Sequence, residues 1–192
     1  MNSSPDAPFF SLVIPVYKVE RFLPDALDSV REQTFTDYEV FCVDDGSPDG
    51  SGALLDEAAR GDGRLRVIHQ RNAGVSAARN RALDRVRGTY VLFLDPDDAI
   101  CPEWFATFAK VIHAHHPDLV QFDYHYIEEA DDWRAVSVSA WEDNRCHVAT
   151  DALTCGELWG ERFVSAGHPV TKAWRANLLK DRYFPVGIAL YE

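Results

Sequence analysis

Hydrophobic positions in the first two thirds of the chain follow two alternating periods. Nearly continuous apolar runs, typical of strands buried on both faces, occupy residues 10–17, 38–43, 65–69, 89–94 and 119–126. Between them, apolar residues recur at helical spacing, which predicts helices over residues 23–33, 54–58, 75–86 and 105–112. Strands that alternate with helices at short intervals imply βαβ crossovers. The sequence therefore predicts an α/β fold with a mostly parallel sheet flanked by helices.

The pattern weakens after about residue 128, and a less regular C-terminal part is expected. Residues 134–141 alternate in a strand-like manner, and residues 151–182 are predicted to be helical in two pieces. Four aromatic residues in this part could face a ligand, although such residues more often belong to a core or an interface. They are Trp133, Trp141, Trp159 and Phe163.

Composition narrows the function classes. Of the 192 residues, 46% are hydrophobic and 26% are charged, an ordinary balance for a globular domain. The net charge of −12 argues against a nucleic-acid partner. No apolar run approaches the roughly 18 residues of a transmembrane segment, and no signal peptide is visible at the N-terminus. Without an export signal, the 4 cysteines are expected to be reduced thiols in the cytoplasm, and their spacing, with no Cys-x-x-Cys pair, argues against a zinc site.

Two acidic clusters each follow a predicted strand directly. Asp44 and Asp45 end the second strand, and Asp95, Asp97 and Asp98 follow the fourth. Ligands of parallel sheets bind beyond the carboxyl ends of the strands, so both clusters are expected at the same edge. The three crowded carboxylates of the second cluster repel one another, and Mg²⁺ or Mn²⁺ would relieve the repulsion. The first cluster could accept a hydrogen bond from a base imide or from ribose. Taken alone, each cluster also fits a turn or a helix N-cap.

A segment of small residues, 72–80, leads into the third predicted helix. The helix N-terminus suits an anion, and Arg79, one turn inside, could reach a diphosphate or pair with a carboxylate instead. Three histidines in residues 113–116 are more typical of a solvated helix end than of a metal site. The sequence contains no dinucleotide-binding glycine motif, P-loop or nucleophile elbow, which disfavours those three kinds of site.

Five motifs then stand in order along the chain, in residues 11–17, 29–35, 43–47, 72–80 and 94–98. With this order and spacing the chain resembles the inverting family 2 glycosyltransferases of GT-A fold, strongly over residues 9–128. Residues 172–192 are similar to the family as well. The resemblance implies that residues 1–128 are the nucleotide-sugar-binding half of a GT-A domain. Residues 129–192 would form an acceptor-side segment that stops before the domain ends.

The resemblance implies a nucleotide site built from five of the matching residues. Pro15 and Tyr17 would line the nucleotide pocket, with Tyr17 near the base. Asp45 would contact the base ring, and Asp44 would support the same loop. Arg79 would lie near the nucleotide or its diphosphate.

The resemblance also implies a metal site and a catalytic base. Asp95 would contact ribose or metal, Asp97 would ligate the metal, and Asp98 would support the metal or the donor sugar. Glu192 matches the first acid of a Glu-Asp pair that includes the family's catalytic base, and the second acid would fall after it. Lys18 departs from the family, which often has Asn at that position.

The activity implied by the resemblance is sugar transfer from a nucleoside diphosphate, with a UDP-sugar as the expected donor, and with inversion. Mg²⁺ or Mn²⁺ would neutralise the departing diphosphate, and a carboxylate would accept the proton of the attacking hydroxyl. The acceptor would be a carbohydrate or a lipid-linked molecule of surface polysaccharide or glycoconjugate synthesis, met in the cytoplasm or at the membrane periphery. Without the second acid, the chain is expected to bind the donor and the metal but to be impaired in transfer.

Two other classes stay open at this point. A sugar nucleotidyltransferase also combines a parallel sheet with acidic metal ligands, although it usually has a glycine-rich loop after the first strand. Residues 16–19 contain no glycine. The other alternative is a non-catalytic module that binds a nucleotide or sugar within a larger protein.

Overall fold

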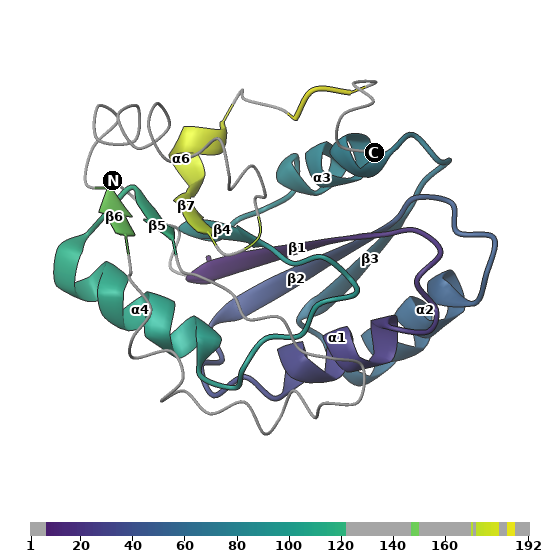
Figure 1. Ribbon diagram of the computed structural model, residues 1–192, viewed down its shortest axis with the longest axis horizontal. Helices are drawn as coiled ribbons and strands as arrows, with labels where there is room; N and C mark the ends of the chain where they lie inside the picture. The colour runs from purple at the N-terminus through teal and green to yellow at the C-terminus, as the bar shows by residue number, and fades with distance from the viewer. Residues whose placement is uncertain (1–6, 122–146, 150–169, 171, 181–183, 187–192) are drawn as a thin grey trace.

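A computed structural model describes residues 7–121, 147–149, 170, 172–180 and 184–186 (Figure 1). The strands are β1 (Phe10–Val16), β2 (Tyr38–Asp44), β3 (Leu65–His69), β4 (Tyr90–Phe93), β5 (Leu119–Gln121), β6 (His147–Ala149) and β7 (Lys172–Arg175). The helices are α1 (Leu23–Arg31), α2 (Ser51–Gly61), α3 (Val75–Leu83), α4 (Trp104–His115) and α6 (Ala176–Leu179).

The described strands form one seven-stranded sheet in the order β3-β2-β1-β4-β7-β5-β6. The first four of these strands pair in parallel, whereas β7 is antiparallel to β4 and β5, and β6 is antiparallel to β5. All strands except β6 and β7 therefore run in one direction, and the predicted α/β fold with a mostly parallel sheet is confirmed. The register places Val16 beside Asp44 and Asp44 beside His69, so the carboxyl ends of β1, β2 and β3 line up.

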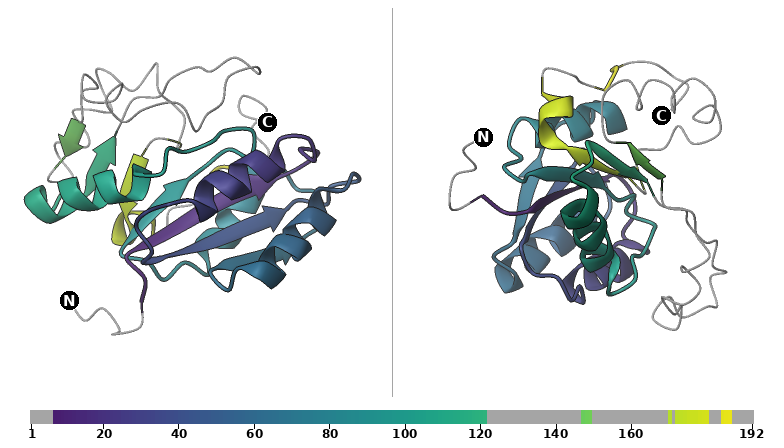
Figure 2. Two further views of the ribbon diagram at one scale, coloured as in Figure 1. Left: turned by 90° about the horizontal axis from the view of Figure 1, so that it is seen from below. Right: turned by 90° about the vertical axis from the view of Figure 1, so that its left-hand side faces the viewer.

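Helices cover both faces of this sheet. Helices α1, α2 and α4 lie on one face, and α3 and α6 lie on the other (Figure 1 and Figure 2). Alternate residues of the strands enter two cores: Leu12 and Leu92 belong to the larger one, and Val13 and Val91 to the one beneath α3. Burial on both faces explains why the strands read as continuous apolar runs rather than as alternating patterns.

Several predicted boundaries differ from the structure. Helices α1 and α3 end earlier than predicted, at Arg31 and Leu83. Gly88, which precedes β4, belongs to no helix. Its lack of a side chain serves packing instead, because a Cβ there would lie 2.5 Å from the backbone nitrogen of Ser11.

The prediction of helix was wrong for residues 172–175, which form β7. This strand inserts between β4 and β5, where its backbone pairs on both sides and Ala173 becomes fully buried. Tertiary pairing thus overrides the local helical pattern. Because β7 lies after residue 128, the sheet draws on both parts of the predicted division of the chain. Residues 134–141, 151–169 and the four aromatic candidates lie outside the described residues.

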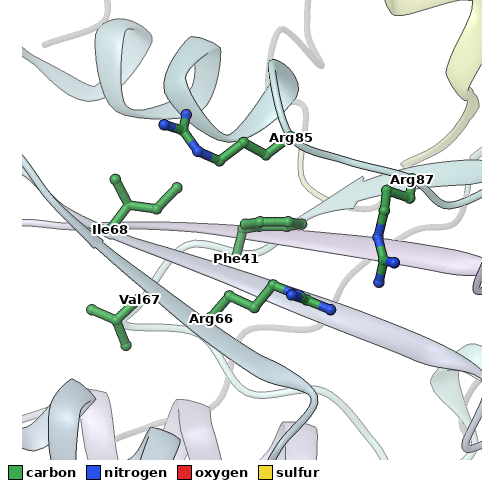
Figure 3. Close-up of a pocket in the computed structure, with 6 residues that line it drawn as sticks. All are labelled: Phe41, Arg66, Val67, Ile68, Arg85 and Arg87. Carbon is green, nitrogen blue, oxygen red and sulfur yellow. The ribbon is translucent and has the colours of Figure 1, made fainter.

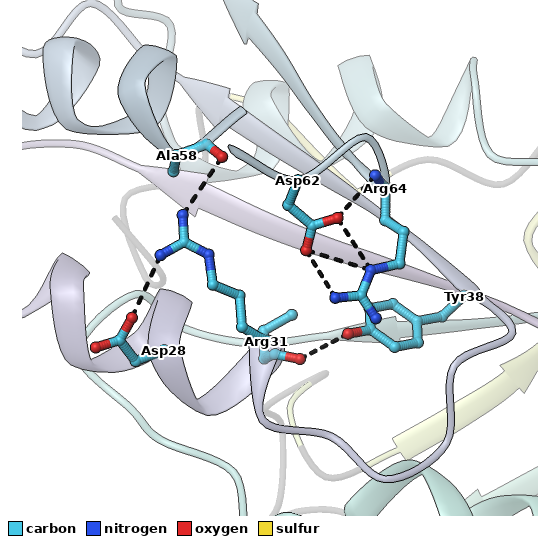
Figure 4. A network of polar contacts seen from close by, with 7 residues as sticks. Asp28, Arg31, Tyr38, Ala58, Asp62 and Arg64 are labelled. Carbon is cyan, nitrogen blue, oxygen red and sulfur yellow. Dashed lines mark hydrogen bonds and ion pairs between the residues drawn. The ribbon is translucent and has the colours of Figure 1, made fainter. Parts of the chain in front are cut away.

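A polar network fastens the amino end of the sheet, opposite the acidic clusters (Figure 4). The Tyr38 hydroxyl donates to the Val30 carbonyl at 2.7 Å, which joins β2 to the end of α1. The Arg64 guanidinium lies over the Tyr38 ring, 4.5 Å from its centroid, and binds Asp62. These contacts stabilise the amino end of the sheet and lie far from the predicted site. Within the part of the chain that the structure describes, no helix is long and apolar enough to cross a membrane.

Candidate active site

The two acidic clusters meet at one edge of the sheet. Asp44 ends β2, and Asp95 lies two residues after β4, with β1 between the two strands. Neighbouring strands are about 4.8 Å apart, so these two positions are separated by roughly 10 Å across the sheet. This edge, formed by the carboxyl ends of β1 to β4 and the loops that follow them, is called the carboxyl rim below. The expectation that both clusters share an edge is confirmed.

Asp45 is buried beneath the loop that joins β3 to α3. Only 2% of the residue is exposed. One carboxylate oxygen accepts hydrogen bonds from the Gln70 side chain at 2.7 Å and the Ala73 N–H at 2.9 Å. The other accepts the Gly74 N–H at 2.8 Å. The carboxylate therefore ties this loop to the rim, and a contact between Asp45 and a base stays a prediction.

Glycine is needed where this loop enters α3. Gly74 has φ 90° and ψ 160°, a backbone conformation that residues with a side chain rarely adopt. That conformation turns the Gly74 N–H toward Asp45 and sets the direction in which α3 begins. The backbone of this segment of small residues thus binds the carboxylate of Asp45.

Asp44 organises the turn that follows β2. Its carboxylate accepts the Ser47 N–H at 2.9 Å and contacts Nδ1 of His69 at 2.9 Å. Burial disfavours the charged form of Asp44, but the hydrogen bonds from Ser47 and His69 outweigh it and hold the pKa of this carboxyl below its usual value. Gly46, at φ 71°, supplies the left-handed backbone that the turn requires. Asp44 therefore fixes this turn, and its part in a nucleotide site stays a prediction.

The loop after β1 carries an exposed aromatic residue at its start, Tyr17. Tyr17 is 42% exposed, with the Lys18 ammonium 5.1 Å from its ring centroid. The Lys18 N–H donates to the Ser47 hydroxyl at 3.3 Å, so this loop is joined to the turn after β2. Pro15 is buried in β1 beyond the last residue paired with β4, where its missing N–H removes no bond to that strand.

Arg79 and Asp95 form an ion pair between α3 and the loop after β4. The guanidinium NH2 group donates to the Asp95 carboxylate at 2.9 Å, and its carbon lies 5.5 Å from the Phe184 ring centroid. Burial lowers the pKa of Arg79 and the charge of Asp95 opposes that shift. Nε of Arg79 is buried and has no hydrogen-bond partner among the described residues. The structure thus places a cation next to the carboxylates, with one donor still available.

Asp97 and Asp98 are exposed on the same loop. The Asp98 N–H donates to the Asp95 carbonyl at 3.1 Å, which bends the loop after β4 into a turn. No group of three His, Cys, Asp or Glu side chains among the described residues is arranged to hold a metal ion. Mg²⁺, however, commonly takes one or two carboxylates and fills its other positions with phosphate oxygens and water. Asp95 and Asp97 suit that kind of site.

The remaining predicted residues do not join the rim. Glu192 lies outside the described residues. The histidines of residues 113–116 are exposed at the end of α4, as expected for a solvated helix end. A hollow of about 410 Å³ opens instead on the face of the sheet that carries α3 (Figure 3). Its lining residues are Phe41, Arg66, Val67, Ile68, Arg85 and Arg87. None of the predicted site residues belongs to it.

Sequence reasoning missed two residues of the rim. His69 ends β3 beside Asp44, and the Gln70 side chain binds Asp45. Both lie at the carboxyl end of a parallel strand, so the rule that located the aspartates could also have found them. Phe184 lies in the segment 172–192 that resembles the family, and its backbone makes two hydrogen bonds to the Asn80 side chain, each 2.8 Å long. The two residues are more than a hundred positions apart in sequence, so no local sequence pattern could predict their contact.

Comparison with known proteins agrees with this arrangement. The model of the glycosyl transferase family 2 matches residues 11–164. The uncharacterized glycosyltransferase EpsJ of Bacillus subtilis is 40% identical over 113 residues, which are 59% of this chain and 33% of EpsJ. Glycosyltransferase GlyA of Streptococcus pneumoniae is 39% identical over 121 residues, 63% of this chain and 17% of GlyA.

A solved structure extends the likeness to the fold. The crystal structure of S. aureus TarS 1–349 in complex with UDP-GlcNAc aligns with a TM-score of 0.72 at 27% identity. The alignment covers 93% of this chain and 49% of that one. The chain spans about a third or less of the length of the two relatives named above.

Proposed function

The chain belongs to the glycosyl transferase family 2, and from this premise we propose that it takes part in transferring a sugar from a nucleoside diphosphate to an acceptor hydroxyl, with inversion. A UDP-sugar is the proposed donor, and a carbohydrate or lipid-linked molecule of polysaccharide or glycoconjugate synthesis is the proposed acceptor. The observation that carries the proposal is the carboxyl rim, where Tyr17, Arg79 and the two acidic clusters come together.

Support for a uridine donor comes from the rim and from one relative. TarS, 27% identical, has been solved with UDP-GlcNAc. In this chain, the exposed ring of Tyr17 offers a face on which a base can stack. The turn beneath it, from Asp44 to Ser47, is held in one conformation by hydrogen bonds to its own backbone and to its neighbours. A preformed loop of this kind binds a nucleotide without paying to be ordered first.

Asp95 and Asp97 would hold the divalent cation, Mg²⁺ or Mn²⁺. When bound, such an ion neutralises charge on the diphosphate that leaves. Arg79 would add its own positive charge to the site, because its guanidinium lies beside Asp95. The ion pair also fixes the orientation of the Asp95 carboxylate. Asp98 would contact the donor sugar, and Glu192 would belong to the acid pair that accepts the proton of the acceptor.

Calorimetric titration of UDP into the chain, with and without Mn²⁺, tests this proposal. We expect UDP to bind more tightly with Mn²⁺, and Asp97→Asn to lower the affinity measured with Mn²⁺ by at least roughly tenfold. Asp37→Asn is the matched control, since Asp37 is exposed before the amino end of β2, away from the rim. The proposal is wrong if no nucleotide binds, or if binding is indifferent to Mn²⁺ and to Asp97.

A transfer assay separates the enzyme from the non-catalytic alternative. The assay measures release of UDP from UDP-GlcNAc with a carbohydrate acceptor present, using a chain that continues past Glu192. Acceptor-dependent release is the expected result. Binding without any release, over a panel of acceptors and donors, would favour the binding module. The family assignment already favours transfer over the nucleotidyltransferase alternative.

A further inference from the structure

His69 lies between two carboxylates at the end of β3. Its Nδ1 is 2.9 Å from a carboxylate oxygen of Asp44, on β2, and its Nε2 is 3.0 Å from a carboxylate oxygen of Asp56, on α2. These are the charged groups that face the ring from the two elements packed against it. The ring is 47% exposed, so protons can reach it from solvent.

This geometry specifies the protonation state of the ring. A carboxylate can only accept a hydrogen bond, whereas neutral imidazole has a single N–H to donate. With one N–H, one of the two contacts would set a nitrogen lone pair against an oxygen lone pair. Both contacts are favourable only when the ring is an imidazolium that donates from both nitrogens. In agreement, hydrogen bonds to Asp44 and Asp56 raise the pKa of His69 above its usual value.

Helix α2 leaves room for the contact because glycine stands at position 52. A Cβ on Gly52 would lie 3.0 Å from the Asp44 carboxylate and 3.6 Å from the His69 ring. The first distance is tighter than ordinary van der Waals contact. Helix α2 can therefore pack closely against the side chains of Asp44 and His69. This packing places Asp56 within hydrogen-bonding distance of the ring.

The contacts continue from His69 to the nucleotide side of the rim. Asp44 uses its other oxygen to accept the Ser47 N–H, and the Ser47 hydroxyl accepts the N–H of Lys18, the residue after Tyr17. A change in the charge of His69 therefore acts directly on Asp44. Through Asp44 it acts on the turn that contains Ser47 and on the loop that contains Tyr17 and Lys18. Gln70 adds a parallel link, because its backbone N–H donates to the Asp44 carbonyl and its side chain binds Asp45.

We propose that His69 is a positioning residue whose imidazolium form holds the Asp44 turn in the shape that binds the nucleotide. The inference rests on the proposed function, because it assigns His69 a part in the same nucleotide site. When the imidazolium loses a proton, the ring can donate only one hydrogen bond to the two carboxylates. The Asp44 turn is then held less firmly. Affinity for the nucleotide then depends on pH through a residue that does not touch the ligand.

The sign of the effect follows from the raised pKa. The imidazolium contacts are fully present at a pH below the pKa of an unperturbed histidine, and they are lost as the pH rises through the raised pKa of His69. Nucleotide affinity should accordingly be highest at the acid end of the range from pH 6 to 9. By linkage, bound nucleotide should raise the pKa of His69 further and draw in a proton.

The test is the affinity for UDP with Mn²⁺, measured by calorimetry from pH 6 to 9. In the unsubstituted chain we expect the affinity to fall about fivefold across this range, the lower end of usual coupling between sites. His69→Gln should remove that step, because the amide does not titrate. Asp56→Asn should move the step to lower pH, because it removes one of the two charges that stabilise the imidazolium. His115→Gln, an exposed histidine of α4, is the control and should change neither.

A second measurement needs no nucleotide. Titration of the histidine ring signals by NMR, with His69 identified from the His69→Gln spectrum, should show its pKa raised in the unsubstituted chain and lowered by Asp56→Asn. The amide signals of Ser47 and Lys18 should shift with the same midpoint. If they do not move with His69, or if His69→Gln keeps the pH step in affinity, the inference is wrong. If the amides respond but no nucleotide binds at any pH, the proposed function fails and the link from His69 to the loops stands.

Discussion

Arg79 shows how one side chain can serve both the structure and the proposed chemistry. It is 8% exposed, bound to Asp95 and set against the Phe184 ring, yet its buried Nε has no partner in the described part of the chain. A buried donor without a partner costs free energy unless a ligand supplies the acceptor. Its sequence position alone fitted either a diphosphate contact or an ion pair, and the structure contains the ion pair.

Replacing Arg79 by Met keeps the length of the side chain and removes its charge and donors. We expect Arg79→Met to weaken UDP binding by about tenfold, the loss of one charge-assisted hydrogen bond. The free energy of unfolding should fall by less than the free energy of UDP binding, because Asp95 is partly exposed and water can solvate its carboxylate. Calorimetry and thermal unfolding measure the two effects. Arg81→Met, an exposed position on the same helix, should alter neither. Equal affinities for both variants would contradict a role for Arg79 in binding.

Single residues were also where sequence reasoning fell short. The position of Asp45 at the rim followed from the strand pattern, but its hydrogen bonds to the loop from Gln70 to Gly74 did not. Those bonds join groups that are about 25 to 30 residues apart in sequence, and only the paired register of β2 and β3 brings them together. The sequence thus predicted where Asp45 lies but not which groups its carboxylate binds.

At the scale of elements, apolar runs predicted β1 to β4 closely, because burial on both faces leaves an unmistakable pattern. Predicted helix ends were less accurate, since apolar residues continue past Leu83 although α3 stops there. Strand β7 was missed because nothing in residues 172–175 distinguishes a strand from a helix until β4 and β5 offer their edges. Local patterns report what an element buries and not which neighbour it pairs with.

Gly74 lies at the start of α3, where we expect a substitution to lower the stability of the protein. Its φ of 90° and ψ of 160° lie in a region that is nearly restricted to glycine, so Gly74→Ala should lower the free energy of unfolding by about 1–3 kcal/mol. Urea denaturation followed by circular dichroism measures this change. Gly61→Ala is the control, because Gly61 is the last residue of α2 and a Cβ there would meet nothing within 4 Å. A loss at position 61 as large as at position 74 would show that the backbone conformation is not the cause.

At the scale of the whole molecule, the larger core seals Cys42 within β2. The residue is fully buried, and burial raises the pKa of its thiol to about 12. The thiolate is the reactive form, so alkylation of Cys42 at pH 8 should require that the sheet open. Peptide-resolved mass spectrometry after treatment with iodoacetamide measures this directly. We expect modification of Cys42 to rise with urea in step with global unfolding; rapid labelling in native buffer would contradict the packing of the core.

The order of the strands has one more consequence. Strand β3 stands at the end of the sheet, and no other described strand pairs with its outer side. An open strand of this kind can recruit the same strand of a second molecule and start aggregation. Arg64 stands directly before this strand and Arg66 lies within it, so charged side chains border the open edge. Charged side chains on an edge strand disfavour pairing with a second copy, so we expect the strand that supplies His69 to the rim to resist self-association as well.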